Sequence, residues 1–182
     1  MNTINTERLE KNIIDNIHEA QLKLGYDGRP VSLNYTPATL RHLTGSDDMG
    51  EISEAVKSCS PGRLGAMEIR PVHDIYCITV PAEGTAYVNA LYSGDNGFLC
   101  RLVGTVREHG ISLDDVLAVF RSFSDNVAVK ESGSEEFDYL VYFEDGVPDE
   151  YYYCLTLEPC MGGGCHITYH RFIREDYEDL NF

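Results

Sequence analysis

The sequence lacks both the long apolar runs and the excess of basic residues that mark two large classes of protein. No window reaches the roughly 18 consecutive apolar residues of a membrane-spanning helix, and the first 20 residues hold no apolar run of the export type. Lys and Arg number 14 against 30 Asp and Glu, which gives a formal charge of −16. Phosphates and anionic lipids attract proteins through basic side chains, so this charge predicts a chain that binds neither nucleic acid nor membranes. We therefore expect a cytoplasmic protein.

Recognisable catalytic motifs are absent as well. The sequence contains no nucleophile elbow, phosphate-binding P-loop, dinucleotide fingerprint or H-E-x-x-H pair. The segment 102–123 has the outline of a helix-turn-helix, but Arg121 is the only base on its second helix, so a helical hairpin is the better interpretation. Catalytic residues stay unknown, and whether the chain is an enzyme is left open.

Hydrophobic periodicity in the N-terminal part predicts mostly helices. A helical spacing of apolar residues runs through 6–24, with Thr6 as the expected N-cap and Gly25 as the stop. Further helices are expected near 37, over 48–59, from 98 to 109 and from Ser112 onward; short strands are expected over 31–35, 64–72 and 75–80. The segment 84–93 fits neither pattern.

After residue 126 the period of the apolar residues changes from 3.6 to 2. Segments 127–131, 137–144, 151–157 and 166–173 read as an antiparallel meander joined by short polar or glycine-rich turns. The acidic tail 174–182 is expected to be a short docking helix. The length and the 43% hydrophobic content suit one α+β domain over 1–182, with a helical half over about 1–125 packed beside an antiparallel sheet that ends in the meander of about 126–182.

The whole chain resembles an uncharacterised family of proteins from anaerobic Gram-positive gut bacteria, a domain of unknown function. The resemblance lies in ordinary helix and strand residues, in the stretches 9–15 (LEKNIID), 21–26 (QLKLGY), 136–146 (EFDYLVYFEDG) and 169–172 (YHRF). It implies a bacterial cytoplasmic setting and carries no activity and no catalytic residues.

The densest chemistry lies in the last hairpin, where 154–170 holds three of the six cysteines and two of the six histidines. Side chains alternate across a strand, so odd positions of the meander are expected to face the core. Cys154, Glu158, His166 and His170 would then share the other face. Thiolate, imidazole and carboxylate are the usual ligands of zinc, so these four residues form a candidate zinc site.

Two other interpretations of the hairpin are open. Cys160 and Cys165 flank the Gly-Gly-Gly turn and are candidates for a reversible redox pair, since a chain without an export signal favours thiols over a disulfide framework. Alternatively, the face is an ordinary polar sheet surface with packed cysteines and a glycine turn.

Two functions follow from these observations. The leading hypothesis is a non-enzymatic, acidic, cytosolic binding or regulatory domain with an unidentified protein or small-molecule partner. The second is a zinc-binding protein or metal-dependent hydrolase that uses the C-terminal hairpin, with Glu158 as fourth ligand or general base.

Overall fold

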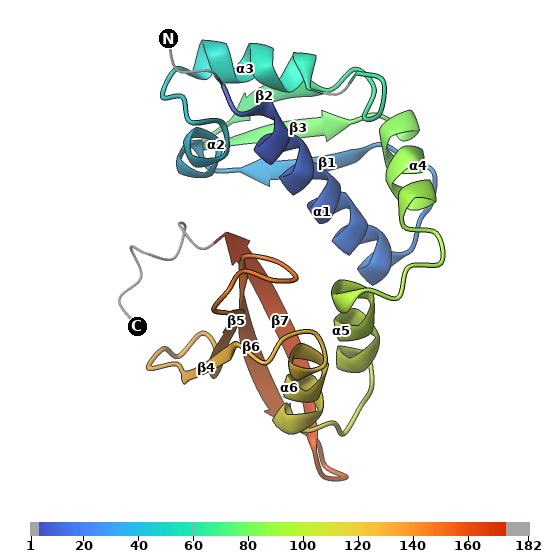
Figure 1. Ribbon diagram of the computed structural model, residues 1–182, viewed down its shortest axis with the longest axis vertical. Helices are drawn as coiled ribbons and strands as arrows, with labels where there is room; N and C mark the ends of the chain where they lie inside the picture. Colours follow the sequence, from blue (N-terminus) through green and yellow to red (C-terminus); the bar gives the residue numbers. More distant parts are fainter. Residues whose placement is uncertain (1–3, 60, 174–182) are drawn as a thin grey trace. The chain divides into compact units, whose positions relative to one another are not determined.

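The computed structural model describes residues 4–59 and 61–173. These residues form helices and two antiparallel sheets, which confirms the predicted α+β class (Figure 1). The chain divides into two compact units, 1–95 and 96–182. The prediction of a single domain over 1–182 stays a prediction, because contacts within each unit do not show whether the units unfold together. No described helix is long and apolar enough to cross a membrane.

The first unit is a three-stranded sheet with four helices. Its elements in chain order are α1 Thr6–Leu24, β1 Val31–Tyr35, α2 Pro37–Thr44, α3 Met49–Ser58, β2 Glu68–Val72, β3 Ile75–Val80 and α4 Ala82–Leu91. The strands pair in the order β1-β3-β2. In Figure 1, α1 runs past β1 and packs against α2 and α4, while α3 lies along β2.

The long helix α1 follows the predicted apolar spacing. Leu9, Ile13 and Ile17 are completely buried, because residues three or four apart lie on the same face of a helix. Burial of each such side chain contributes about 1.5–3 kcal/mol. The prediction of Thr6 as N-cap is wrong: Asn5 holds that position, and its side-chain oxygen accepts a hydrogen bond from the backbone N–H of Arg8.

The second unit is a four-stranded sheet packed on two short helices. Its elements are α5 Phe98–Val106, α6 Leu113–Arg121, β4 Val127–Glu131, β5 Tyr139–Phe143, β6 Tyr151–Pro159 and β7 Cys165–Ile173. The strand order β4-β5-β6-β7 is the predicted meander. The predicted capping box at the start of α6 is also confirmed, since Ser112 and Asp115 bond to each other's backbone N–H.

Aromatic rings fill the core of the second unit. Phe98 of α5 meets Phe120, Phe143 and Tyr153 edge to face, with ring centroids 4.8–5.5 Å apart. Such pairs add about 0.5–1.5 kcal/mol each to the burial of the rings. The odd positions of β6 and β7 face this core, as predicted. The tail 174–182, for which a docking helix was predicted, lies outside the described residues.

Several boundaries differ from the sequence-based expectations, and the strand expected over 64–72 begins only at Glu68. Most of the ambiguous segment 84–93 belongs to a helix, α4, which ends at Leu91. Gly84 of this helix packs against the carbonyl of Leu64 so closely that a Cβ atom would overlap it. The helix expected over 98–109 ends at Val106, and the chain then turns through Gly110, whose φ is +74°.

Candidate functional site

The β6–β7 hairpin has the register that the candidate zinc site requires. Cys154 lies opposite His170, and Glu158 lies opposite His166. Because side chains alternate across a strand, these four positions fall on one face of the sheet, away from the aromatic core. The shared face is therefore as predicted from the sequence.

The same register separates the four residues into two pairs. The pairs are four positions apart along each strand, which is about 13 Å, whereas zinc ligands lie about 2.0–2.3 Å from the ion. Within 4–59 and 61–173, no three His, Cys, Asp or Glu side chains gather closely enough to hold a metal ion. A single centre with all four ligands does not agree with this geometry.

Cys154 lies in an apolar environment on that face. Its side chain is 1% exposed and packs with Phe137, Leu140 and Tyr142, with Tyr152 at the margin. A buried cysteine of this kind behaves as a small hydrophobic residue. A packed cysteine at this position is part of the alternative of a polar face with packed cysteines, and His170 on the neighbouring strand is exposed.

The two cysteines of the redox hypothesis lie on consecutive rungs of the hairpin. The Cys160 N–H donates to the Gly164 carbonyl at 3.0 Å, and the Cys160 carbonyl accepts from the Gly163 N–H at 3.1 Å. Cys165 lies opposite Pro159. Side chains on consecutive rungs alternate between faces, whereas a disulfide needs Cβ atoms about 3.5–4.5 Å apart. All six cysteines are free thiols.

The structure brings a residue to this hairpin that sequence reasoning missed. The ring of His109, from the turn after α5, lies 5.6 Å from the ring of His166 between centroids, with an interplanar angle of 34°. The Nδ1 atom of His166 is buried and has no hydrogen-bond partner among the described residues. The sequence offered one signal, the His109-Gly110 pair at the end of a helix, but nothing in it pointed to the hairpin.

Backbone contacts hold the His109 segment against β7. Ile111 forms an isolated antiparallel bridge with Cys165, whose N–H donates to the Ile111 carbonyl at 2.7 Å. The Gly110 N–H donates to the Cys165 carbonyl at 3.2 Å. A Cβ atom at Gly164 would overlap the Gly110 backbone, so glycine is needed for the two segments to approach.

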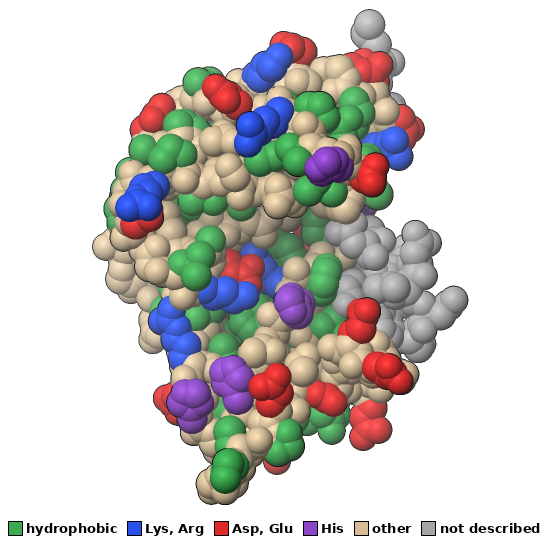
Figure 2. All heavy atoms as spheres, turned by 180° about the vertical axis from the view of Figure 1, so that it is seen from behind, with side chains coloured by type: hydrophobic (Ala, Val, Ile, Leu, Met, Phe, Trp, Pro, Cys, Tyr) green, Lys and Arg blue, Asp and Glu red, His purple; other side chains and the backbone are tan. Residues whose placement is uncertain are grey.

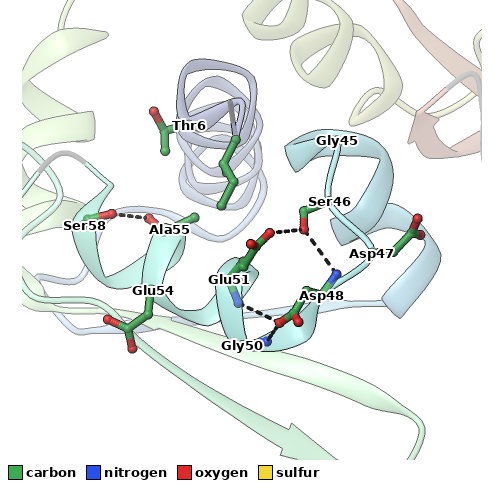
Figure 3. Close-up of a pocket in the computed structure, with 11 residues that line it drawn as sticks. Thr6, Gly45, Ser46, Asp47, Asp48, Gly50, Glu51, Glu54, Ala55 and Ser58 are labelled. Atoms are coloured by element: carbon green, nitrogen blue, oxygen red, sulfur yellow. Dashed lines mark hydrogen bonds between the residues drawn. The ribbon is translucent and has the colours of Figure 1, made fainter. Parts of the chain in front are cut away.

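A separate feature of the first unit is an open pocket of about 920 Å³ (Figure 3). It lies where the start of α1 meets the loop between α2 and α3 and the exposed side of α3. Ile4 and Ala55 supply apolar surface. Its acidic lining residues are Asp47, Asp48, Glu51 and Glu54, and none of the lining residues that the structure describes is basic.

Two of these acids organise the loop. The Asp48 carboxylate caps α3 by accepting hydrogen bonds from the N–H groups of Gly50 at 2.7 Å and Glu51 at 3.0 Å. Glu51 accepts a 2.8 Å bond from the Ser46 hydroxyl, as Figure 3 shows. These bonds satisfy the free amides of the helix start and fix the pocket wall.

The other two acids point to solvent. The side chain of Asp47 is 100% exposed with Arg41 at 3.7 Å, and that of Glu54 is 75% exposed with Lys57 at 2.8 Å. Exposed ion pairs of this kind stabilise a protein by only about 0–1 kcal/mol. Each of these two carboxylates can therefore release its Arg41 or Lys57 partner and pair with a cationic group of a ligand instead.

The family model that matches residues 6–181 is described as a domain of unknown function from E. rectale, DUF3877. The chain belongs to the DUF3877 family. This confirms the resemblance seen in the sequence. Comparison with curated proteins and with solved structures found no match. The DUF3877 description assigns no activity, so function has to be argued from the structure of this chain.

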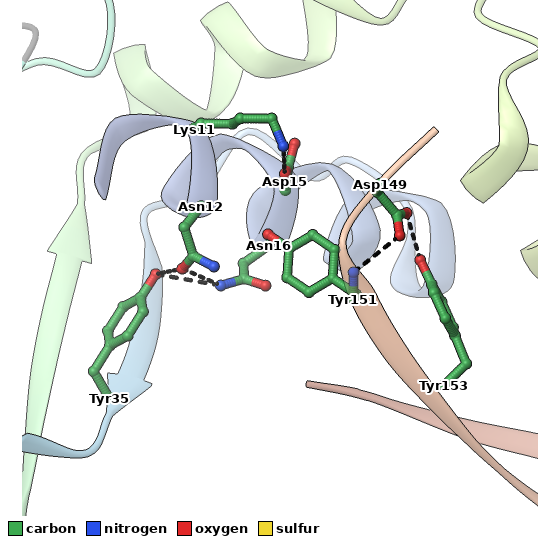
Figure 4. Close-up of polar contacts among 8 residues, drawn as sticks. All are labelled: Lys11, Asn12, Asp15, Asn16, Tyr35, Asp149, Tyr151 and Tyr153. Carbon is green, nitrogen blue, oxygen red and sulfur yellow. Dashed lines mark hydrogen bonds and ion pairs between the residues drawn. The ribbon is translucent and has the colours of Figure 1, made fainter. Parts of the chain in front are cut away.

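Each unit of this DUF3877 chain contains a buried tyrosine whose hydroxyl is hydrogen-bonded within that unit (Figure 4). In the first unit, the Tyr35 hydroxyl donates to the Asn12 side-chain oxygen at 2.9 Å, and Asn16 donates to the same oxygen at 3.0 Å. In the second unit, the Tyr153 hydroxyl donates to Asp149 at 2.7 Å. Burial, and next the negative charge of Asp149, raise the pKa of Tyr153 well above its ordinary value, so the phenol stays protonated as a donor.

Proposed function

We propose that this chain is a non-enzymatic binding domain of the bacterial cytoplasm whose α2–α3 pocket takes a cationic segment of a partner protein. The observation that carries the proposal is the lining of the pocket. Four carboxylates and no base surround an apolar floor, in a volume of about 920 Å³, within the size range typical of ligand sites.

The lining selects for a ligand that is both cationic and partly apolar. A lysine or arginine side chain has an aliphatic stem that covers apolar surface and a charged head that reaches a carboxylate. Ile4 and Ala55 match the stem, while Asp47 and Glu54 match the head. A smaller pocket beside α1 is lined by Lys11 and Arg63 as well as acids, so it lacks this one-sided charge.

The charge of the whole chain supports the same class of partner. A formal charge of −16 attracts cations over long distances and increases their association rate. On the face that Figure 2 shows, acidic side chains lie at many places rather than in one patch. Overall charge therefore brings a basic partner close, and the pocket supplies the specific contact.

A titration with a short lysine-rich peptide tests the proposal. We expect saturable binding that weakens as salt rises, since the contact is between exposed charges. The double variant Asp47→Asn/Glu54→Gln should weaken binding by about tenfold or more, because it removes both exchangeable carboxylates. Asp48 and Glu51 are left unchanged because they hold the loop.

The matched control is Glu68→Gln/Asp74→Asn, which removes two exposed acids that do not line the pocket. It changes the net charge by the same amount and should leave peptide affinity within about twofold of the unsubstituted chain. Equal weakening by both double variants would mean that net charge alone attracts the peptide, and would contradict the pocket. Binding of free lysine but not of the peptide would replace the protein partner by a small molecule.

The metal-dependent hydrolase hypothesis has weaker support. A catalytic zinc needs about three protein ligands and an open position for water. The pairs Cys154/His170 and Glu158/His166 lie too far apart to supply them together. The geometry therefore favours the binding domain.

A further inference from the structure

We propose that His109 and His166 form a binding site for a divalent transition-metal ion of the Zn²⁺ or Ni²⁺ type. This site lies in the second unit and does not depend on the function proposed for the α2–α3 pocket. It replaces Cys154 and His170 of the sequence-based zinc hypothesis with a residue from another part of the chain.

The spacing of the two rings suits a shared ion. A zinc–imidazole bond is about 2.0–2.1 Å long, so two rings bound to one ion have centroids about 5–6 Å apart. The centroids of His109 and His166 are 5.6 Å apart. The rings are tilted by 34°, and neither is stacked on the other.

One nitrogen at this site lacks a partner. Nδ1 of His166 is buried, and no described group donates to it or accepts from it. A buried polar atom in that state costs free energy, since it has lost water without gaining a hydrogen bond. Coordination between the rings would give it a partner.

The backbone holds the two histidines close before any ion arrives. The Ile111–Cys165 bridge and the Gly110–Cys165 hydrogen bond fix the residues next to His109 and His166 in the chain. The close packing of Gly164 on Gly110 removes the room for a shift. A preorganised pair of ligands loses less conformational entropy on binding, which raises affinity for the ion.

Glu158 can add a third ligand only by moving, because no three His, Cys, Asp or Glu side chains of the described residues lie close enough together to hold an ion as they stand. It lies opposite His166 on the same face of the hairpin and is exposed, so its carboxylate can rotate toward the rings when an ion binds. Two imidazoles with a carboxylate and water form a common ligand set for zinc. The site is therefore of the kind that binds an exchangeable ion.

Calorimetric titration of the full chain, without a polyhistidine tag and freed of metal by a chelator, tests the site. With Zn²⁺ and with Ni²⁺ we expect one equivalent to bind. His109→Ala and His166→Ala should each weaken affinity by about tenfold or more, since each removes one of two imidazoles. His170→Ala is the matched control, because it removes an exposed histidine from the same strand and face as His166.

Absence of saturable binding would overturn the proposal. It would also fail if His109→Ala bound metal like the unsubstituted chain, or if His170→Ala weakened binding as much as His166→Ala. A second measurement needs no variant to fold: Ni²⁺ added to the unsubstituted chain should broaden the imidazole NMR signals of His109 and His166 before that of His170. If the signal of His170 broadened first, the ion would be assigned to the Cys154/His170 pair and the proposal would fail.

Discussion

Gly164 packs against Gly110 so closely that a Cβ atom on Gly164 would overlap the Gly110 carbonyl oxygen. Gly164 also has a φ of +68°, a left-handed conformation that favours glycine. This contact joins the turn after α5 to the tip of the β6–β7 hairpin.

Gly164→Ala is expected to destabilise the chain. The new methyl group cannot fit against the Gly110 backbone, and alanine is strained at positive φ, so the free energy of unfolding should fall by about 1–3 kcal/mol. Urea unfolding measures the change. Gly162→Ala is the control in the same turn, because nothing lies within 4 Å of its Cβ position. Its effect should stay within about 0.5 kcal/mol; an equal loss in both variants would rule out the packing explanation.

Tyr35→Phe is expected to weaken the first unit. It removes the 2.9 Å bond from the phenol to the buried Asn12 oxygen, and such bonds contribute about 0.5–1.5 kcal/mol to stability. Tyr76→Phe on the neighbouring strand is a matched control, since Tyr76 lies opposite Tyr35 and no described group bonds to its hydroxyl. Chemical denaturation of both variants should show a loss for Tyr35→Phe alone. A neutral Tyr35→Phe would mean that the Asn16 bond to Asn12 is sufficient.

Cys59 is expected to react with iodoacetamide much more slowly than Cys160. Burial first, and then the negative charge of Glu10, raise the pKa of its thiol to about 11, and its side chain is 1% exposed. Only the thiolate reacts. At pH 8 the rise of the pKa from 9.0 to about 11 therefore lowers the reactive fraction of Cys59 by about a hundredfold. Peptide mapping by mass spectrometry, with Cys160 in the exposed turn as the internal comparison, measures the order. Modification of Cys59 before Cys160 in folded protein would contradict the burial.

The same shift has a consequence for stability at high pH. The unfolded thiol titrates near 9, whereas the folded thiol titrates near 11. The unfolded state therefore loses its proton first, and the contribution of Cys59 is complete below about pH 9 and declines as the pH rises from 9 through 11. Cys59→Ala should flatten this part of the stability profile, measured by urea unfolding at pH 8, 9 and 10. An unchanged slope would assign the alkaline loss to other groups, such as the tyrosines.

The expected single domain leads to one cooperative unfolding transition. If 1–182 unfolds together, far-ultraviolet circular dichroism and tyrosine fluorescence should report the same midpoint. Limited proteolysis should then give no stable fragment ending near Asp95, where the two compact units meet in the sequence. Two midpoints, or a protected fragment of either unit, would show that 1–95 and 96–182 fold separately.

Local sequence determined much of the fold. The apolar spacing of α1, the Ser112–Asp115 capping box and the alternation of β6 and β7 could be predicted because each depends on residues a few positions apart. The register of the β6–β7 hairpin was a condition of the predicted shared face, and the pairing of Cys154 with His170 meets it. The Thr6 prediction failed by one position because Asn5 and Thr6 are both good capping residues and only the helix geometry distinguishes them.

Tertiary structure alone decided the candidate sites. Alternation placed Cys154 on the face opposite the aromatic core, but only the packing of Phe137 and Leu140 around it shows that this part of the face is buried. The α2–α3 pocket forms where the start of α1 meets a loop distant in sequence, and His109 reaches His166 through pairing between segments with no common motif. Such proximities depend on how the elements pack, and periodicity carries no information about that because it reports only which side of an element is buried.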